Sequence, residues 1–173
     1  MKKLKLIIFA VIFFGIGIYT NIYFKTSNSD VIDGPSLGTI LALPFHLSDG
    51  SSLSLSQIDI QDKLVINFWA TWCEPCKKEL PQLNKFHQQF INDDKIQIIG
   101  IAIDEPDAVK IFNKEIPVDF VNLIDEQNGF SVTRYLKNEK GVLPYTVIVN
   151  KQYEVIEQFY GEITLEMLLK AFK

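Results

Sequence analysis

Residues 64–81 read LVINFWATWCEPCKKELP, and they contain the clearest structural signals in the chain. Its first part, residues 64–69, is a short and continuous apolar run with β-branched side chains at Val65 and Ile66. Such a run predicts a central strand that is buried on both faces. From residue 73 to residue 90 the apolar side chains fall at spacings of three and four, which predicts an amphipathic helix. The stretch is therefore a strand, a turn and a helix, with two cysteines where the helix begins.

The two cysteines, Cys73 and Cys76, have the placement that thiol chemistry requires. Free backbone N–H groups and the helix dipole at a helix N-terminus favour a thiolate, which is the nucleophile in disulfide exchange. Two intervening residues put both sulfurs on the first turn, near enough to bond to each other. Pro75 fits the first turn because it has no N–H to leave unsatisfied, whereas the carboxylate of Glu74 opposes a negative charge on Cys73. We expect Cys73 to attack a substrate disulfide and Cys76 to resolve the mixed disulfide, or the reverse steps to oxidise a substrate.

Two other uses of the cysteine pair are weaker interpretations. A zinc site needs four ligands, but His87 lies eleven residues after Cys76, roughly 16 Å along the same helix, and His46 alone does not complete a site. Both histidines are expected to be ordinary surface or hairpin residues. A structural disulfide that closes a loop this short restricts the unfolded chain little. Redox exchange is therefore preferred, with no metal ion.

The rest of the chain alternates strands with helices, which predicts an α/β fold with a mostly parallel central sheet whose last two strands are antiparallel. Pro81 lies inside the first helix and is expected to kink it. Asp49-Gly50 predicts the turn of an early hairpin, and Thr164 can cap the last helix. The predicted elements are the hairpin over 43–47 and 53–55, strands over 96–103, 120–124, 145–150 and 154–159, and helices over 106–114, 127–136 and 165–172.

The N-terminus differs from the rest. Lysines at positions 2, 3 and 5 precede an apolar run over residues 6–24, which as a helix would span roughly 28 Å, close to a bilayer core. We expect an uncleaved signal anchor over 1–24, because no small-residue cleavage site follows; a cleaved signal or a buried helix is the alternative. Residues 25–38 are predicted to be a polar linker and 39–173 the folded domain. The positive start favours a cytoplasmic N-terminus, so in a bacterium the domain would lie on the outer, periplasmic side of the inner membrane.

Composition excludes some classes of function. The formal net charge of −4 argues against nucleic-acid binding, which favours a basic face. Two cysteines and two histidines leave little room for an all-protein zinc or iron–sulfur site.

Beyond these patterns, the chain resembles the TlpA/ResA-like membrane-anchored thiol-disulfide oxidoreductases of the thioredoxin superfamily. The resemblance rests on the Phe-Trp-Ala-Thr-Trp lead-in at 68–72, the Cys-Glu-Pro-Cys centre at 73–76, the helix proline Pro81 and the GVLPYT segment at 141–146. It implies a thioredoxin-like fold whose central mixed sheet is flanked by helices, with an N-terminal β-hairpin and a central helical insertion over 104–120. It also implies an enzyme that reduces disulfides of proteins such as apocytochrome c. A membrane protein would supply the electrons, and the Cys73–Cys76 disulfide would serve without a bound cofactor.

The resemblance further assigns roles to single residues. It implies that the Leu143–Pro144 bond is cis and that both residues, with Trp72, contact the substrate. Glu79 and Glu105 match acidic positions near the cysteines, where they would tune the thiol pKa together with Glu74 and Pro75. The plain alternatives are a solvated helix residue for Glu79, a helix cap for Glu105 and a strand-start proline for Pro144.

Two positions depart from what the superfamily leads one to expect. Asn67 stands where ordinary thioredoxins carry a buried Asp, so a proton relay would have to use Glu79, Glu105 or water. Tyr145 follows Pro144 where many relatives have Thr or Glu, which bears on substrate preference.

Rival functions remain open at this point. A disulfide oxidase or isomerase would use the same cysteines in another direction. A copper-handling thioredoxin-fold chaperone would add a soft ligand, but Met1 and Met167 are the only methionines and neither lies near the motif in sequence. A peroxidase would need a cysteine in a different motif.

Overall fold

The computed structural model describes residues 35–93 and 95–172. The predicted signal anchor over 1–24 and most of the predicted linker lie outside these residues. No helix in the described part of the chain combines the length and the apolar character needed to cross a membrane.

The described residues contain a seven-stranded sheet in the order β2-β1-β5-β4-β3-β6-β7. The hairpin β1–β2 forms as predicted, since its strands pair antiparallel around a turn in which Gly50 has a φ of +87°. The strands are β1 Pro44–His46, β2 Ser52–Ser54, β3 Lys63–Trp69, β4 Ile96–Ala102, β5 Val121–Ile124, β6 Tyr145–Asn150 and β7 Val155–Tyr160.

The sheet is mixed, as the family resemblance implies, and the mostly parallel sheet that the alternation of strands and helices indicated is wrong. Parallel pairing is confined to β3 with β4 and β4 with β5, whereas β6 runs antiparallel to β3. The cause is the connection from β5 to β6. It ends at Tyr145, which lies opposite Phe68, at the edge of the sheet where β3, β4 and β5 also end. A strand that starts at this edge must run back against its neighbour, because a parallel strand needs a crossover to the opposite edge.

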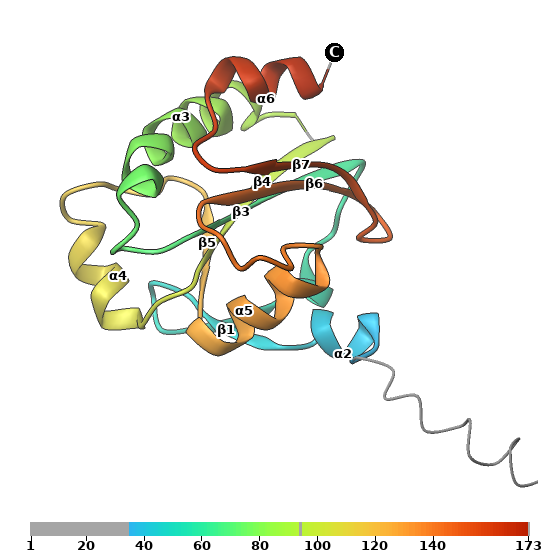
Figure 1. Cartoon of the computed structure of the whole chain (residues 1–173), viewed down its shortest axis with the longest axis horizontal. Coiled ribbons are helices and arrows are strands. Elements are labelled where there is room, and N and C mark those ends of the chain that lie inside the picture. The colour runs from blue at the N-terminus through green and yellow to red at the C-terminus, as the bar shows by residue number, and fades with distance from the viewer. Residues whose placement is uncertain (1–34, 94, 173) are drawn as a thin grey trace, which may run out of the picture. The chain divides into compact units, whose positions relative to one another are not determined.

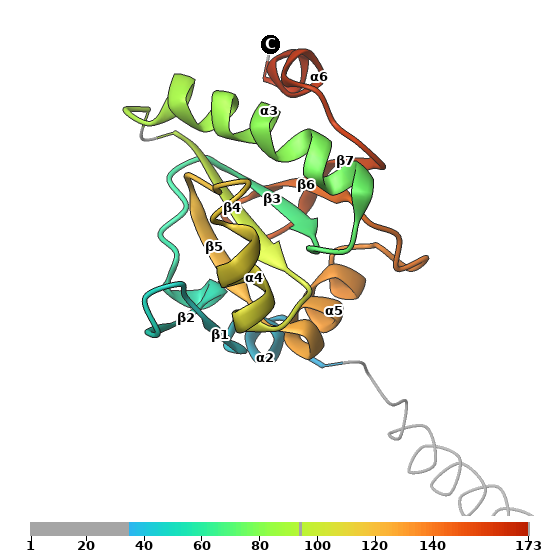
Figure 2. The ribbon, with the colours of Figure 1, turned by 90° about the vertical axis from the view of Figure 1, so that its left-hand side faces the viewer.

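Helices cover both faces of the sheet (Figures 1 and 2). Side chains of β3 alternate between the faces: Val65 and Trp69 pack with α3, α4 and α6, whereas Leu64, Ile66 and Phe68 pack with α2 and α5. This alternation explains why the apolar run of β3 is continuous. The helices are α2 Leu37–Leu41, α3 Glu74–Phe90, α4 Pro106–Phe112, α5 Glu126–Tyr135 and α6 Leu165–Ala171, with a 3₁₀ turn at Leu55–Gln57.

The helices follow the sequence with small differences. The predicted insertion over 104–120 contains α4, which lies between β4 and β5, and Thr164 caps α6 by accepting a hydrogen bond from the Met167 N–H at 3.3 Å. The helix α2 was not predicted, and it begins two residues before the predicted domain boundary at Thr39. Ile40 of this helix is buried in the core on the α5 side.

Candidate active site

The cysteine pair lies where the central strand passes into the long helix. β3 ends at Trp69, and Cys73 is the N-cap of α3. Cys73 and Cys76 form a disulfide with Cα atoms 5.2 Å apart, and the Cys76 N–H donates to Cys73 Sγ at 3.3 Å. The Cys73 sulfur therefore occupies the position of a helix-capping acceptor, where a thiolate would receive a backbone hydrogen bond and the favourable end of the helix dipole.

Exposed side chains adjoin this disulfide. Trp72 is 64% exposed, although it directly precedes Cys73, which is only 5% exposed. Glu74 is exposed and forms an ion pair with Lys77 one turn along α3. The hydrogen bond and charge of Lys77 lower the pKa of Glu74, so this carboxyl is ionised at neutral pH. A negative charge thus stands beside Cys73, offset in part by the lysine.

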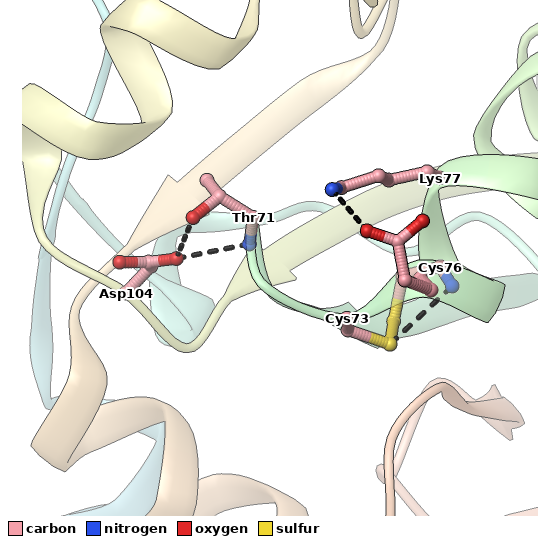
Figure 3. A network of polar contacts seen from close by, with 6 residues as sticks. Thr71, Cys73, Cys76, Lys77 and Asp104 are labelled. Carbon is pink, nitrogen blue, oxygen red and sulfur yellow. Dashed lines mark hydrogen bonds and ion pairs between the residues drawn. A yellow bond between two sulfur atoms is a disulfide. The ribbon is translucent and has the colours of Figure 1, made fainter.

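Asp104 fixes the loop that carries Trp72 and Cys73. Its Oδ2 atom accepts hydrogen bonds from the Thr71 N–H at 2.9 Å and the Thr71 hydroxyl at 2.6 Å (Figure 3). The sequence placed Asp104 only at the first position of the predicted insertion over 104–120. The sequence did contain a signal for this contact, because Asp104 closely follows β4, the parallel neighbour of β3. The loops after two parallel neighbours leave from the same edge of the sheet, so residues in them can meet.

Glu79 is buried, so the interpretation as a solvated helix residue was wrong. It lies one turn after Cys76 on α3, and 0% of it is exposed. Its Oε1 atom accepts a hydrogen bond from Asn67 Nδ2 at 2.7 Å, and its Oε2 atom accepts one from the Ile163 N–H at 3.0 Å. Burial raises the pKa of Glu79 to about 7, although the two hydrogen bonds oppose the rise. A buried carboxyl that can bind or release a proton near neutral pH therefore lies one turn of α3 after Cys76.

Asn67 belongs to the same buried polar group. It lies on β3 opposite Thr146 of β6, and its amide donates to Thr146 Oγ1 at 2.9 Å as well as to Glu79. The position at which ordinary thioredoxins carry an acid is thus occupied by a neutral donor, and the acid comes from α3 instead.

The predicted cis bond is confirmed: the Leu143–Pro144 peptide is cis. Pro144 is buried immediately before β6, whose first residue pairs with Phe68, so it lies at the edge of the sheet from which the 70–73 loop leaves. The Gly161 N–H donates to the Pro144 carbonyl at 2.9 Å. Leu143 is half-buried and packs against the same cluster of side chains as Cys73 and Cys76. The structure therefore brings Leu143 and Pro144 to the edge that carries the disulfide.

Comparisons with known proteins agree with this geometry. Residues 41–158 match the AhpC/TSA family. The thiol-disulfide oxidoreductase ResA of Bacillus thuringiensis strain Al Hakam is 33% identical over 126 residues, which cover 72% of this chain and 70% of the relative.

The chain belongs to the AhpC/TSA family, and within it to the ResA-like proteins.

Another ResA-like relative, from Bacillus subtilis strain 168, is 30% identical over 83% of this chain and 74% of its own length. The solved structure of a thioredoxin-related protein from Neisseria meningitidis serogroup B is 28% identical, with a TM-score of 0.66 over 75% of this chain and 95% of that one. The family match and the structural likeness confirm the thioredoxin-like fold, and the strand pairing described above shows its mixed sheet. This ResA-like chain is an enzyme, a thiol-disulfide oxidoreductase.

Tyr145 does not contribute to the surface of this ResA-like protein. Its ring is buried against Phe68 and Tyr160, and its hydroxyl donates to the Leu136 carbonyl at 2.7 Å, just after α5. The expected effect on substrate preference therefore has no contact to support it. Tyr145 ties the end of α5 to the sheet instead.

The remaining predicted residues lie outside the buried polar group. Glu105 is exposed and occupies the N-cap position of α4, as the helix-cap alternative predicts, but its side chain makes no capping hydrogen bond. His46 is exposed on β1, and the ring of His87 meets that of Phe120. Within residues 35–93 and 95–172, no three His, Cys, Asp or Glu side chains are placed to hold a metal ion.

Proposed function

We propose that this enzyme reduces disulfides of protein substrates outside the cytoplasm, using Cys73 and Cys76 as its dithiol and no bound cofactor. The observation that carries the direction is the buried carboxyl of Glu79, one turn after Cys76 and with a pKa of about 7. Residues three apart on a helix are neighbours, so a negative charge on Glu79 disfavours a second negative charge on the thiols.

The charge balance favours reduction over oxidation. A dithiol becomes a strong oxidant of other proteins when its reduced form is stabilised. Here Glu79 and Glu74 both oppose a thiolate, while the helix dipole and the Cys76 N–H favour one. Glu79, together with a Glu74 whose charge Lys77 offsets in part, outweighs the single helix terminus and destabilises the reduced form, which then gives up its electrons more readily.

The reaction balances as two exchanges. The Cys73 thiolate attacks one sulfur of the substrate disulfide, forms a mixed disulfide and releases the other substrate sulfur as a thiolate. Glu79, as carboxylate, takes the proton of the Cys76 thiol, and the resulting thiolate attacks Cys73 Sγ. The Cys73–Cys76 disulfide forms, the second substrate sulfur leaves, and two electrons have passed to the substrate. A dithiol protein of the membrane would return the enzyme to its reduced state.

The substrate would bind at the edge of the sheet that holds the disulfide. Trp72 offers an exposed aromatic ring beside Cys73. Leu143 and Pro144 lie at the same edge, next to the first residue of β6. A protein segment that contains a CxxC disulfide, as in an apocytochrome c, would suit this surface, because it can present both sulfurs in a short and accessible loop. Glu105, exposed after β4, would contribute charge to this surface.

The apolar run over residues 6–24, with lysines before it, supports a membrane anchor for this activity. An anchored enzyme on the outer face of a bacterial cytoplasmic membrane would meet both its substrates and a membrane electron donor. Disulfides persist in that compartment, so substrates for a reductase are present there.

The first experiment measures the reduction potential of the Cys73–Cys76 couple in the full-length protein. The protein is equilibrated in thiol–disulfide buffers, and Trp72 fluorescence reports the reduced fraction. A value near about −270 mV supports reduction, whereas a value near about −120 mV makes the protein an oxidant and overturns the direction. Cys76→Ser should then trap a mixed disulfide with a substrate, and Cys73→Ser should not. Tight Cu(I) binding by the dithiol without exchange would favour the copper-handling alternative instead.

A further inference from the structure

The carboxyl group of Glu79 is held from two elements. The Ile163 backbone N–H, in the segment before α6, donates to Oε2 at 3.0 Å. The Asn67 amide, on β3, donates to Oε1 at 2.7 Å. A side-chain substitution can remove the second hydrogen bond but leaves the first in place. Among the described residues, Asn67 is therefore the side chain through which a mutation acts directly on this carboxyl group.

The amide of Asn67 is itself fixed in orientation. Asn67 is buried in the central strand, between Gly100 of β4 and Thr146 of β6 in the register of the sheet. One amide hydrogen points to Glu79 Oε1 and the other to Thr146 Oγ1, at 2.9 Å. The Oδ1 atom is buried and receives no hydrogen bond from the part of the chain that the structure describes. This arrangement presents donors, and not the carbonyl oxygen, to the carboxyl group.

Few charges act on Glu79 from its surroundings. Its own helix brings Cys76, and Cys73 as N-cap, which carry no charge while they form the disulfide. Glu162, in the segment before α6, raises the pKa of Glu79 by its negative charge. The strands β3 and β6 bring the uncharged Asn67 and Thr146. Against burial and Glu162, the charged form of Glu79 is thus supported by the Asn67 amide and the Ile163 N–H.

We propose that Asn67 is a positioning residue that holds Glu79 in its charged form through the Nδ2–Oε1 hydrogen bond, and so sets the pH range in which Glu79 accepts a proton from the thiols. The inference rests on the proposed function, because it gives Glu79 the role of proton acceptor. Asn67 touches neither thiol in this role. It acts by keeping the carboxyl group available as a base at neutral pH, although that group lies in an apolar surrounding.

A direct test measures the titration of Glu79 in the oxidised, full-length protein. Carbon NMR of glutamate labelled at the carboxyl carbon reports each titration, and the Glu79 signal is identified by its loss in Glu79→Gln. Asn67→Leu should move the midpoint upward by about one to two pH units, because a hydrogen bond to a charged group is lost. An unchanged midpoint overturns the proposal.

Two further variants guard against a folding defect. Asn67→Asp places a second carboxyl group against Glu79, so the pair should share a proton and one titration should move well above that of the wild type. Asn122→Leu is the matched control: Asn122 is also a buried strand asparagine, but it accepts from Trp69 Nε1 at 3.0 Å and does not touch Glu79. An equal shift in Asn122→Leu would mean that any loss of a buried amide suffices, which also overturns the proposal.

The second readout is the pH dependence of the reaction between the reduced protein and oxidised glutathione. Asn67→Leu should displace the inflection of the rate profile upward, and the displacement should vanish when both proteins also carry Glu79→Gln. A displacement that persists in the presence of Glu79→Gln contradicts action through Glu79. Failure of the proposed function would look different, since the wild type would then not exchange disulfides at all while the NMR titration still responded to Asn67→Leu.

Discussion

Glu79 shows how strongly burial changes the chemistry of one residue. In solution its carboxyl would be ionised above about pH 5, whereas in the folded protein its pKa is about 7. The folded state therefore binds the proton more tightly than the unfolded state does. The stability that this proton provides is complete below about pH 4.5 and is lost as the pH rises towards and through 7.

Replacing Glu79 by Gln should remove this pH dependence. The free energy of unfolding of the wild type should fall, relative to that of Glu79→Gln, by about 3 kcal/mol between about pH 4.5 and about pH 8. Urea denaturation of the oxidised proteins at several pH values measures the difference, and groups that titrate in both proteins cancel. Parallel stability curves would show that Glu79 has an ordinary pKa.

Asp104 stabilises the loop that precedes the cysteine pair. Its carboxylate holds the Thr71 N–H and hydroxyl, two residues before Cys73. Asp104→Ala should lower the free energy of unfolding by about 1–3 kcal/mol, since a backbone donor and a hydroxyl lose a charged acceptor. It should also alter the fluorescence of Trp72, which follows Thr71.

The matched control for Asp104 is Asp107→Ala, an exposed acid in the first turn of α4. It should change stability by less than about 1 kcal/mol and leave Trp72 fluorescence as it is. Equal effects of the two substitutions would assign the Asp104 result to helix electrostatics instead of the Thr71 contacts.

At the scale of elements, β4 shows why a strand in the centre of the sheet contains a glycine. A Cβ atom on Gly100 would lie 2.5 Å from Asn122 Oδ1 and 3.2 Å from Trp69 Nε1, the two atoms that share a buried hydrogen bond. The Trp69 and Asn122 side chains, from the strands on either side of β4, therefore meet over Gly100.

Gly100→Ala should destabilise the protein by about 1–3 kcal/mol, because the added methyl group displaces Asn122 and overpacks the core. Urea denaturation measures the loss. In the Asn122→Ala background the same substitution should cost clearly less, since the closest obstacle is gone. Additive losses in the double variant would contradict the steric explanation.

The elements also show what sequence patterns can and cannot predict. Residues 64–69 and 73–90 were predicted correctly because a continuous apolar run and a 3.6-residue period are local signals. The helix α2 was missed because Leu37–Leu41 has only five residues, and a helix this short does not repeat the 3.6-residue period often enough to be recognised. The direction of β6 depends on where a loop returns the chain, and the burial of Glu79 depends on Asn67 and Ile163, twelve and eighty-four positions away. Such contacts are set by the tertiary fold and not by neighbours in the sequence.

At the scale of the whole molecule, the packing of the core determines where the folded domain begins. The sequence pattern placed the domain start at Thr39, but α2 begins at Leu37, and its residues pack on the core shared by β1, β3 and α5. Leu37 and Leu41 are half-buried there, and Ile40 is only 3% exposed. A fragment that begins at residue 39 would lack Leu37 and the first turn of a helix that is barely longer than one turn.

We therefore expect a fragment over residues 35–173 to be more stable than one over 39–173 by about 2–3 kcal/mol, which corresponds to the exposure of one large apolar side chain and the loosening of a second. Urea denaturation of the two oxidised fragments measures the difference, and the longer fragment should also show a slightly larger dependence on urea concentration, because more surface is exposed on unfolding. The Ile40→Ala substitution in the 35–173 fragment should reproduce most of the loss in stability, since Ile40 is the buried residue of α2. If instead the two fragments unfold at the same urea concentration, α2 does not contribute to the core, and the domain begins where the sequence pattern placed it.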